Sequence, residues 1–486
     1  MTWKSTGISR RMVLGGLVSL TVPRPPLARA GVKPPLIGAA SSFTTDELVL
    51  RRFSRDWGGM VRRRPAAVAR PATVEDVQGI LRWANRNRCP VAVRGAGHSQ
   101  GGQSLTSGGI VLDMRKLNSI GPAAHGDLDV AGGARWREVV NVAAPKGHVP
   151  RVLTDYLGLS VGGTLSAGGF GSTSHEYGAQ VDNVRELEVV TGAGHVVTCS
   201  AEQDGDLFDA VRGGVGQYGV VVRARIAMRP LPPKGRLYRL SYGDVSTALA
   251  DLRRCVEYGV FQHAWIHVLP GRGRAGEYGS RWARPRCLMG LAQEGDDRDD
   301  ETGKLSAFRH DEIIANVANI PSEEIGRYEP PRWDRWMAHP WRDWLLPASR
   351  AARAVNKALE LLPEELPPEV PGLRSVAALW TFPVDRFTAP AFIIPRTERY
   401  FTGFSFLSRM VGTPAAVRRM REILEEMDRL IIASGGKAYL SGCPDYDTAR
   451  WAQHFGPLWQ QVRFWKARYD PGAILGPGYI AFGSTN

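Results

Sequence analysis

The sequence predicts an α+β protein of two domains with a cleft between them. Its 486 residues are more than one compact core usually holds. Short apolar runs alternate with helical patterns as far as Met228, and the proline-rich stretch Arg229–Lys234 then interrupts them. Beyond this stretch the composition changes, and six of the 14 tryptophans lie between Trp265 and Trp344. Tryptophans gathered in this way are typical of core packing and also of a cleft that binds a ligand.

Five elements follow from the pattern of apolar residues. Residues 73–85 predict a helix capped by Thr73, and the chain then enters a strand at Val91–Val93. Ile110–Met114 and Val220–Ile226 read as further strands. Residues 415–433 predict an amphipathic helix. The apolar residues on one face of this helix are Val417, Met420, Ile423, Leu424, Met427 and Leu430, which indicates a packing face.

The first glycine-rich segment, Arg94–Gln103, follows the strand at Val91–Val93. It begins as a dinucleotide fingerprint, G-x-G-x-x-G, but Gln100 stands where the third glycine is required. A strand follows it instead of a helix, so this segment is predicted to be a loop between two strands. Its glycines allow the backbone to approach a flat or phosphorylated ligand.

Two further glycine-rich segments follow: Thr154–Gly171, which is predicted to be a loop, and Arg212–Gly219. A single segment of this kind is typical of turns. Three segments in order, about 50 to 60 residues apart and each beside a strand, favour a shared binding site.

The charge and the cysteines exclude several classes of site. The formal charge is +14, but residues 1–30 contain five basic residues and no acidic one, so the remainder has +9. This excess is spread along the chain and accompanies no nucleic-acid motif, which predicts no nucleic-acid partner. The five cysteines are scattered without C-x-x-C spacing, so neither a metal site nor a disulfide framework is expected.

The N-terminus predicts export by the twin-arginine route. Ser9–Leu14 contains Arg10 and Arg11, the apolar run Met12–Val22 follows, and Ala28–Ala30 has the small residues of a cleavage site. The apolar run is about half the length that spans a bilayer, so no stable membrane anchor is expected. The predicted location is periplasmic or extracellular. A chance Arg-Arg pair is the alternative.

Several ordered motifs between Pro65 and Phe482 resemble those of a known superfamily. They are R-G-x-G-H-S at Arg94–Ser99, T-D-Y-L-x-L-x-V-G-G-T-L-S at Thr154–Ser166, E-L-x-V-V-T-G at Glu186–Gly192, G-G-x-G-Q-Y-G-V at Gly213–Val220, H-P-W at His339–Trp341, H-F-G at His454–Gly456 and Asp470-Pro471. The chain resembles FAD-linked oxidoreductases of the vanillyl-alcohol-oxidase type, and among them the cytokinin dehydrogenases.

This resemblance implies a PCMH-type FAD-binding domain of two subdomains, with an inserted α+β substrate domain. The expected order is a signal peptide at 1–30, an N-terminal segment at 31–64, the FAD-binding domain at 65–230, the substrate domain at 231–436 and a C-terminal return to the FAD-binding domain at 437–486. The bound cofactor would be FAD, and no metal is expected.

The resemblance also implies roles for two residues. His98 matches the histidine that family members bond to the flavin, although a histidine in a loop is ordinarily a surface or structural residue. Tyr156 stands where some relatives have a cysteine for a second bond, so one covalent bond is expected. Asp155 matches the catalytic base, which takes an N–H or O–H proton as hydride leaves the neighbouring C–H. The alternative is that Asp155 only caps a turn.

The remaining site residues are carried over from the same motifs. The expected cofactor-binding residues are Gly95, Ala96, Gly97, His98, Ser99, Gln103, Asp155, Ser160, Gly163, Thr164, Ser166, Phe170, Val221, Tyr439 and Tyr479.

The chain departs from the family's motifs at two places. His263 in Val260–Ile266 replaces a substrate-binding glutamate and is expected to hold the substrate. Gly476–Tyr479 replaces the usual S-P-G-Q, so some flavin contacts are expected to differ.

The predicted function is a secreted flavoenzyme that oxidises a small amine or alcohol, with an N6-alkyl adenine as the first substrate and a quinone or O2 as electron acceptor. A related FAD oxidase of a sugar, alcohol or secondary metabolite is one alternative. A flavin-containing binding protein without turnover is another, and it requires Asp155 to be inactive.

Overall fold

This computed structural model describes most of the chain after residue 34. The described residues are 35, 37–124, 126–271, 281–295, 302–327, 337–363, 375–442 and 444–483. The expected signal peptide at 1–30 and the arginines of its twin-arginine pattern lie outside them. No helix within the described ranges is long and apolar enough to cross a membrane.

The N-terminal part contains a four-stranded sheet in the order β1-β2-β4-β3. Its strands are β1 (Ser42–Thr44), β2 (Ala67–Arg70), β3 (Val91–Arg94) and β4 (Ile110–Asp113), and α1 (Glu47–Arg52) and α2 (Val74–Arg86) accompany them. β4 pairs in parallel with both β2 and β3. The Thr73 side chain accepts a hydrogen bond from the backbone N–H of Asp76 and so caps α2, as the sequence predicts.

A second sheet follows in the order β5-β6-β10-β8-β9, with β7 also paired to β10. The strands are β5 (Ile120–Ala124), β6 (Asp127–Ala131), β7 (His148–Pro150), β8 (Val184–Thr191), β9 (Val196–Ser200) and β10 (Gly219–Pro230). The helices of this part are α3 (Trp136–Ala143), α4 (Val161–Ala167), α5 (Ser174–Tyr177) and α6 (Gly205–Val211). α4 lies against β10 within the core.

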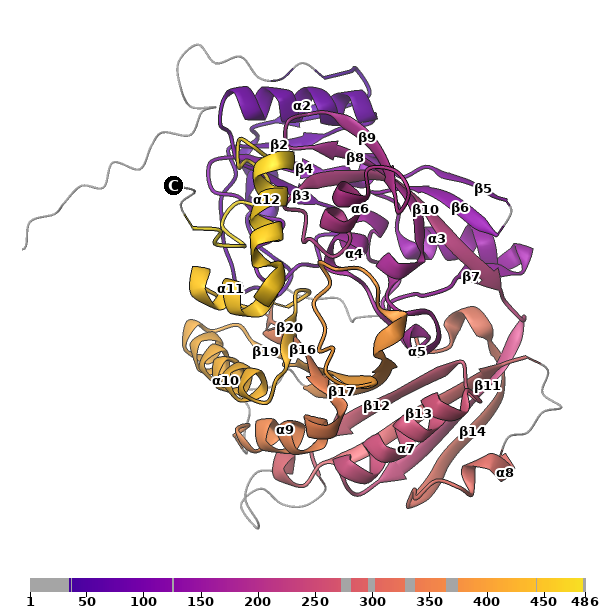
Figure 1. Ribbon diagram of the computed structural model, residues 1–486. Coiled ribbons are helices and arrows are strands. Elements are labelled where there is room, and N and C mark those ends of the chain that lie inside the picture. The colour runs from indigo at the N-terminus through magenta and orange to yellow at the C-terminus, as the bar shows by residue number, and fades with distance from the viewer. Residues whose placement is uncertain are drawn as a thin grey trace, which may run out of the picture.

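An eight-stranded sheet, called here the cap sheet, occupies the other half of the molecule (Figure 1). Its order is β14 (Glu312–Pro321), β11 (Lys234–Tyr242), β13 (Arg286–Glu294), β12 (His263–Leu269), β17 (Val376–Pro383), β18 (Tyr400–Leu407), β16 (Trp341–Pro347) and β20 (Lys437–Tyr439). Its outer face packs on α7 (Val245–Tyr258), α9 (Ala348–Glu360) and α10 (Pro414–Ala433). The short α8 (Thr302–Leu305) and the pair β15 (Met337–Ala338) and β19 (Met410–Val411) complete this half.

The C-terminal segment returns to the first half of the molecule. In Figure 1, α12 (Trp459–Tyr469) lies beside the N-terminal sheets, and α11 (Thr448–Phe455) lies below it, toward α10. The backbone N–H of Val91 donates to the carbonyl of Ile474 at 2.7 Å. The buried Lys466 ammonium bonds Asp470 at 2.7 Å and the carbonyl of Gln217 at 3.0 Å. These contacts fix the C-terminal segment against strands that precede it by hundreds of residues.

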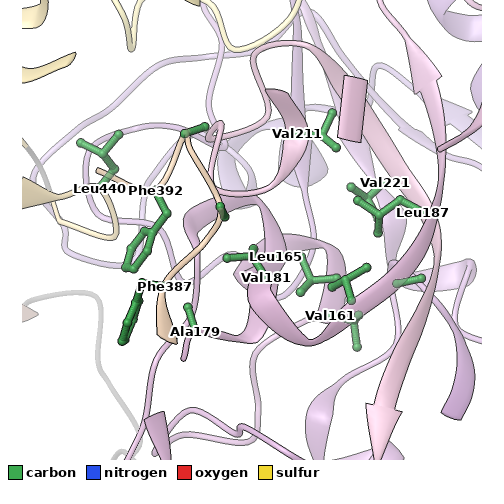
Figure 2. Packing of buried hydrophobic residues seen from close by; sticks show 14 of the residues in the cluster. Val161, Leu165, Ala179, Val181, Leu187, Val211, Val221, Phe387, Phe392 and Leu440 are labelled. Carbon is green, nitrogen blue, oxygen red and sulfur yellow. The ribbon is translucent and has the colours of Figure 1, made fainter. Parts of the chain in front are cut away.

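One apolar core joins the two halves. Figure 2 shows Val161 and Leu165 of α4 packed near Val181, with Phe387 and Phe392 from the loop before β18 beside them. Because this core is continuous, the two halves are held together where these residues meet.

The predicted strands and helices at 73–85, 91–93, 110–114, 220–226 and 415–433 are all present, within a few residues at their ends. Two features differ. The glycine-rich segment Thr154–Gly171 was expected as a loop, but it contains α4, because Ser160 begins a helix whose apolar residues enter the core. The segment 437–439 was expected to belong to the C-terminal return, but β20 pairs with β16 as the last strand of the cap sheet.

Candidate active site

A cavity of about 920 Å³ lies between the glycine-rich loops and the inner face of the cap sheet. The loop wall comes from the segments after β3, around α4 and before β10. Of the expected site residues, the cavity is lined by Gly95, Ala96, Gly97, His98, Ser99, Gln103, Asp155, Ser160, Gly163, Thr164, Ser166, Phe170, Val221 and Tyr439. The structure therefore brings together all but two of them, His263 and Tyr479.

His98 projects into the cavity from the loop between β3 and β4. Its ring centroid lies 3.9 Å from that of Trp57 and 5.1 Å from that of Tyr156. Burial, with a smaller contribution from the nearby His339, lowers the pKa of His98 to about 3. Neither ring nitrogen has a hydrogen-bond partner among the described residues. His98 is thus a neutral imidazole with a free nitrogen inside a cavity, which is the form that acts as a nucleophile.

The loop of His98 touches the N-terminus of α4. The Ser160 Oγ accepts a hydrogen bond from the backbone N–H of Ala96 at 3.3 Å. A Cβ on Gly95 would lie only 2.0 Å from this hydroxyl, so only glycine permits the approach. Two of the predicted motifs are therefore joined at one point of the cavity wall.

Asp155 lines the cavity on the same wall. Burial raises the pKa of its carboxyl to about 6, while the positive charge of Arg327 opposes this rise. Arg327 is held in turn by a 3.2 Å hydrogen bond from its Nη1 to the carbonyl of Thr154. The Asp155 carboxylate accepts no hydrogen bond from any residue that the structure describes, so the turn-capping interpretation has no support in the geometry. A buried carboxyl with a pKa near neutrality is suited to accept a proton.

The cap sheet forms the opposite wall with three adjacent rows of side chains. In one row the strand register aligns Tyr439, Asp343, Ser405, Ala378 and His267. A second row contains Trp341, Leu407 and Val376, and a third contains Trp265, Gly290 and Arg239. Except for Gly290, all of these residues line the cavity.

Asp343 is a carboxyl on the cap-sheet wall of the cavity. Its Oδ1 accepts a 2.5 Å hydrogen bond from the Trp341 indole, and its Oδ2 accepts one from the hydroxyl of Ser441. Burial raises the pKa of Asp343, and these donors oppose the rise. The Trp341 indole also donates to Ser405 at 2.8 Å. Asp343 therefore fixes the orientation of Trp341, whose ring centroid lies 6.2 Å from that of Trp57.

Phe170 and Tyr439 form the aromatic floor between the two walls. Their ring centroids are 4.9 Å apart, and Phe170 also meets Trp380 edge-on at 5.3 Å. The Tyr439 hydroxyl accepts a 3.0 Å hydrogen bond from the backbone N–H of Gly169. Tyr439 thereby connects the cap sheet to the segment after α4.

Two expected site residues lie behind the wall. The Tyr479 hydroxyl donates to the carbonyls of Leu440 and Gly442, the same carbonyls that the Gln103 amide bonds. His263 is fully buried at the start of β12 and does not line the cavity, in contrast to the expectation that it holds the substrate. Its neighbours on the same strand face, Trp265 and His267, line the cavity instead.

Other residues of the cavity were missed by the sequence analysis. Trp341 lies within the H-P-W motif, and the alternation of strand 341–347 places Asp343 on the same face, so this pair was accessible from the strand pattern. Trp57 and Arg327 lie outside every motif, and their place at the cavity depends on tertiary packing.

The cavity suits FAD. Its loop wall offers backbone N–H groups and glycines, where a Cβ on Gly163 would lie 2.7 Å from the Ser160 hydroxyl. His98 offers a nitrogen for a covalent bond. Within the described residues no group of three or more metal-ligating side chains is found.

Two family models match the chain. The model of the FAD binding domain matches residues 65–200. The model described as "Cytokinin dehydrogenase 1, FAD and cytokinin binding" matches residues 321–482. These matches cover the cavity segments after β3 and around α4, and the part of the cap sheet from β16 to β20.

Similar proteins extend the resemblance over nearly the whole chain. An uncharacterized oxidoreductase, ORF5 in the fasciation locus of Rhodococcoides fascians, is 34% identical over 90% of this chain and 98% of its own length. Cytokinin dehydrogenase 7 of Oryza sativa subsp. japonica is 31% identical over 92% of this chain and 93% of its own.

Two solved structures share the fold. They are 6-hydroxy-D-nicotine oxidase of Arthrobacter nicotinovorans (22% identity, TM-score 0.70, 91% of this chain and 98% of the other) and xylooligosaccharide oxidase of Myceliophthora thermophila (19% identity, TM-score 0.71, 92% and 98%). Fold, cavity and sequence lead to one conclusion: the chain is an FAD-dependent oxidoreductase that belongs to the family of the cytokinin dehydrogenases and related PCMH-type FAD oxidases.

Proposed function

We propose that the protein oxidises a small amine or alcohol by removing hydride from a C–H bond next to an N–H or O–H group. The observation that carries this proposal is the position of Asp155, a buried carboxyl with a pKa of about 6 on the same cavity wall as His98. A binding protein without turnover has no need of a buried base at this place.

Bound FAD supplies the hydride acceptor. As the C–H bond of the substrate breaks, positive charge develops on the carbon and its N–H or O–H group becomes acidic. The Asp155 carboxylate takes this proton, which leaves a C=N or C=O double bond in the product. Arg327 keeps the carboxylate ionised, because its guanidinium lowers the pKa that burial alone would give.

A single covalent bond between His98 and FAD is part of the proposal. The neutral ring with a free nitrogen favours it, and Tyr156, at the position of the second link in some relatives, offers no thiol. Such a bond keeps the cofactor in place while substrate and acceptor exchange.

The proposed substrate is an N6-alkyl adenine. The cavity is lined by Trp341, Trp380 and Trp265 of the cap sheet, and aromatic side chains are suited to pack against a planar heterocycle. The rice relatives, named cytokinin dehydrogenases, support this choice.

The test is anaerobic addition of isopentenyladenine to the purified holoenzyme while the visible absorbance of the oxidised flavin is recorded. Bleaching by this compound, and none by adenine, supports the proposal. Bleaching by xylobiose or another sugar instead would identify an oxidase of a different substrate class. If no amine, alcohol or sugar bleaches the flavin, the protein binds flavin without turnover and the proposal is wrong.

The proposed electron acceptor is a quinone or O2. Mixing the reduced enzyme with each compound shows which of the two reoxidises the flavin faster.

The proposed location is the periplasm or the medium, reached by the twin-arginine route. This route exports folded proteins, so the cofactor can be bound before export.

A further inference from the structure

Trp57 lines the cavity from the loop between α1 and β2, outside both segments that the family models match. Its ring centroid lies 3.9 Å from that of His98, and the two ring planes are inclined by 33°. Tyr156 also contacts His98, with its ring centroid at 5.1 Å. Of these two aromatic neighbours of the histidine, Trp57 is the nearer.

Ring packing orients the His98 imidazole. Neither of its nitrogens has a hydrogen-bond partner in the described part of the chain, so no hydrogen bond there fixes the rotation of the ring about its Cβ–Cγ bond. This torsion is broad and roughly two-fold for histidine. A half rotation exchanges a nitrogen and a carbon at the edge of the ring, so the atom that faces the cavity depends on the rings packed against His98.

The turn that carries Trp57 is closed by Asp56. The Oδ1 of Asp56 accepts hydrogen bonds from the backbone N–H groups of Met60 at 3.0 Å and Val61 at 3.1 Å. Gly59 has a φ of +69° within this turn, a conformation that favours glycine. The backbone around Trp57 is therefore fixed by bonds within its own loop.

Two backbone hydrogen bonds hold this turn between the His98 loop and the cap half. The N–H of Trp57 donates to the carbonyl of Ser99, the residue after His98, at 3.0 Å. The N–H of His339 donates to the carbonyl of Gly58 at 2.8 Å. The indole is thus attached through its own backbone to the loop whose imidazole it packs on.

The H-P-W motif supplies further neighbours of the Trp57 ring. The ring centroid of His339 lies 4.9 Å from that of Trp57, and Trp341 meets the indole edge-on at 6.2 Å. The hydrogen bond of 2.5 Å to Asp343 fixes Trp341 in turn. The motif therefore supports Trp57 from the cap half, and Trp57 connects it to His98.

We infer that Trp57 is the positioning residue for covalent attachment of the flavin: its ring holds the His98 imidazole with a nitrogen toward the cavity, and the H-P-W motif holds Trp57. This inference rests on the proposed function, which includes the bond from His98. As the N–C bond forms, one C–H bond of the flavin 8α-methyl group and the N–H bond of the imidazole break. The isoalloxazine ring takes up the two protons and two electrons, and the proposed acceptor, a quinone or O2, then removes them.

Attachment is measured without substrate, on full-length apoprotein from riboflavin-limited cells that is mixed with FAD in air. Mass spectrometry of acid-quenched samples follows the covalent fraction, and flavin fluorescence follows noncovalent binding. Trp57→Leu should bind FAD but attach it about 10- to 100-fold more slowly than wild type, because a misplaced nucleophile loses its reactive geometry. Trp57→Phe should recover most of the rate, because it restores a ring beside His98.

Two further variants locate the effect. Trp341→Leu keeps Trp57 but removes its support from the cap half, and it should slow attachment by a smaller factor. If Trp57→Leu fails to bind FAD, Trp341→Leu decides, and a wild-type rate in that variant overturns the inference. The control is Trp459→Leu, which removes an indole stacked on Phe482 outside the cavity lining and should attach flavin at the wild-type rate. Equal slowing in Trp459→Leu and Trp57→Leu would indicate a general effect of lost packing and contradict the role of Trp57.

The outcomes separate this inference from the proposed function. If acid-denatured wild type carries no flavin, the proposed covalent bond is wrong and the inference falls with it. If wild type and Trp57→Leu attach flavin at the same rate, the bond stands and the role of Trp57 is wrong. Because no substrate is present, neither result depends on which compound the enzyme oxidises.

Discussion

The Nε2 of His263 lies 2.8 Å from Oε1 of Glu294, and both residues are buried behind the cavity wall. Arg229 binds the same carboxylate through both terminal nitrogens, at 2.5 and 2.7 Å. The other imidazole nitrogen meets the hydroxyl of Ser172 at 2.8 Å. Both imidazole nitrogens therefore have partners within the protein, and the ring connects β12 to β13 and to the segment after α4.

This network predicts that His263→Ala reduces stability rather than substrate affinity. Removing the ring leaves a buried carboxylate with one partner fewer, which costs about 1–3 kcal/mol of unfolding free energy. His263→Gln should restore part of it through its amide. His263→Glu should be worst, because its carboxylate would face Glu294 at close range. Denaturant unfolding of the three variants measures this order.

The exposed His148 supplies the control, since His148→Ala should leave the unfolding midpoint unchanged. If His263→Ala keeps wild-type stability and raises only the KM, the ring contacts substrate and the structural role is wrong.

Stability should fall as the pH falls below about 6.5. Burial lowers the pKa of His263 to about 4, so the unfolded chain takes up a proton on this group before the folded one does. The pKa of Glu294 is lowered to about 2 despite burial, because His263 and Arg229 bond the carboxylate. The stability that this carboxylate contributes is therefore lost as the pH falls from the ordinary pKa of a glutamate toward 2. Both groups act in the same direction.

The unfolding free energy, measured at pH 7.5, 6.5 and 5.5, gives the slope of stability against pH. Each buried histidine of this type contributes up to about 1.4 kcal/mol for each pH unit. The His263→Gln variant should have a shallower slope than wild type. An unchanged slope in that variant would show that His263 does not contribute to the acid sensitivity.

Local patterns predicted the parts of the fold that depend on neighbouring residues. The helix after Thr73 and the strand before His98 follow from capping and periodicity, and the ordered glycine motifs placed Asp155 on the same wall as His98. These signals act over a few residues, so one sequence is enough to detect them.

The cap-sheet wall could not be predicted in this way. The row that joins Asp343 to His267 crosses β18 and β17, and its members come from distant parts of the chain. His263 was assigned by its place in a motif. His263 and His267 lie four residues apart on the same face of β12, and only His267 lines the cavity. The motif alone does not show which of the two positions on this face reaches the cavity.

His98→Ala should abolish covalent attachment of the flavin. Acid-denatured wild-type protein should remain yellow and carry the mass of one FAD, whereas the variant should release its flavin. Tyr156→Phe is the control, because it preserves the ring beside His98 and should keep the bond. Flavin that remains attached to denatured His98→Ala protein would show that another residue forms the link.

Changing Arg10 and Arg11 together to lysine should leave the protein in the cytoplasm. The twin-arginine route requires the arginine pair, and lysine preserves the charge but not the recognised side chain. Fractionation of cells that express wild type and the double variant measures the distribution. The variant of Arg24 and Arg29 to lysine keeps the pair and should be exported. Normal export of the Arg10/Arg11 variant would refute the route.

Asp155→Asn should slow flavin reduction by about 100- to 10,000-fold, the usual contribution of one general base. The amide has nearly the same shape as the carboxylate but cannot take the proton, so bound flavin and the fold should be retained.

In wild type the reduction rate should fall as pH drops through about 6, because protonation of Asp155 removes the base. The variant should lack this step. Arg327→Gln should keep the step and move it to higher pH, because the charge that favours the ionised carboxylate is gone. Stopped-flow reduction at saturating substrate between pH 5 and 9 measures all three profiles. A wild-type rate in Asp155→Asn, or the same pH step in both proteins, would assign the proton to another group.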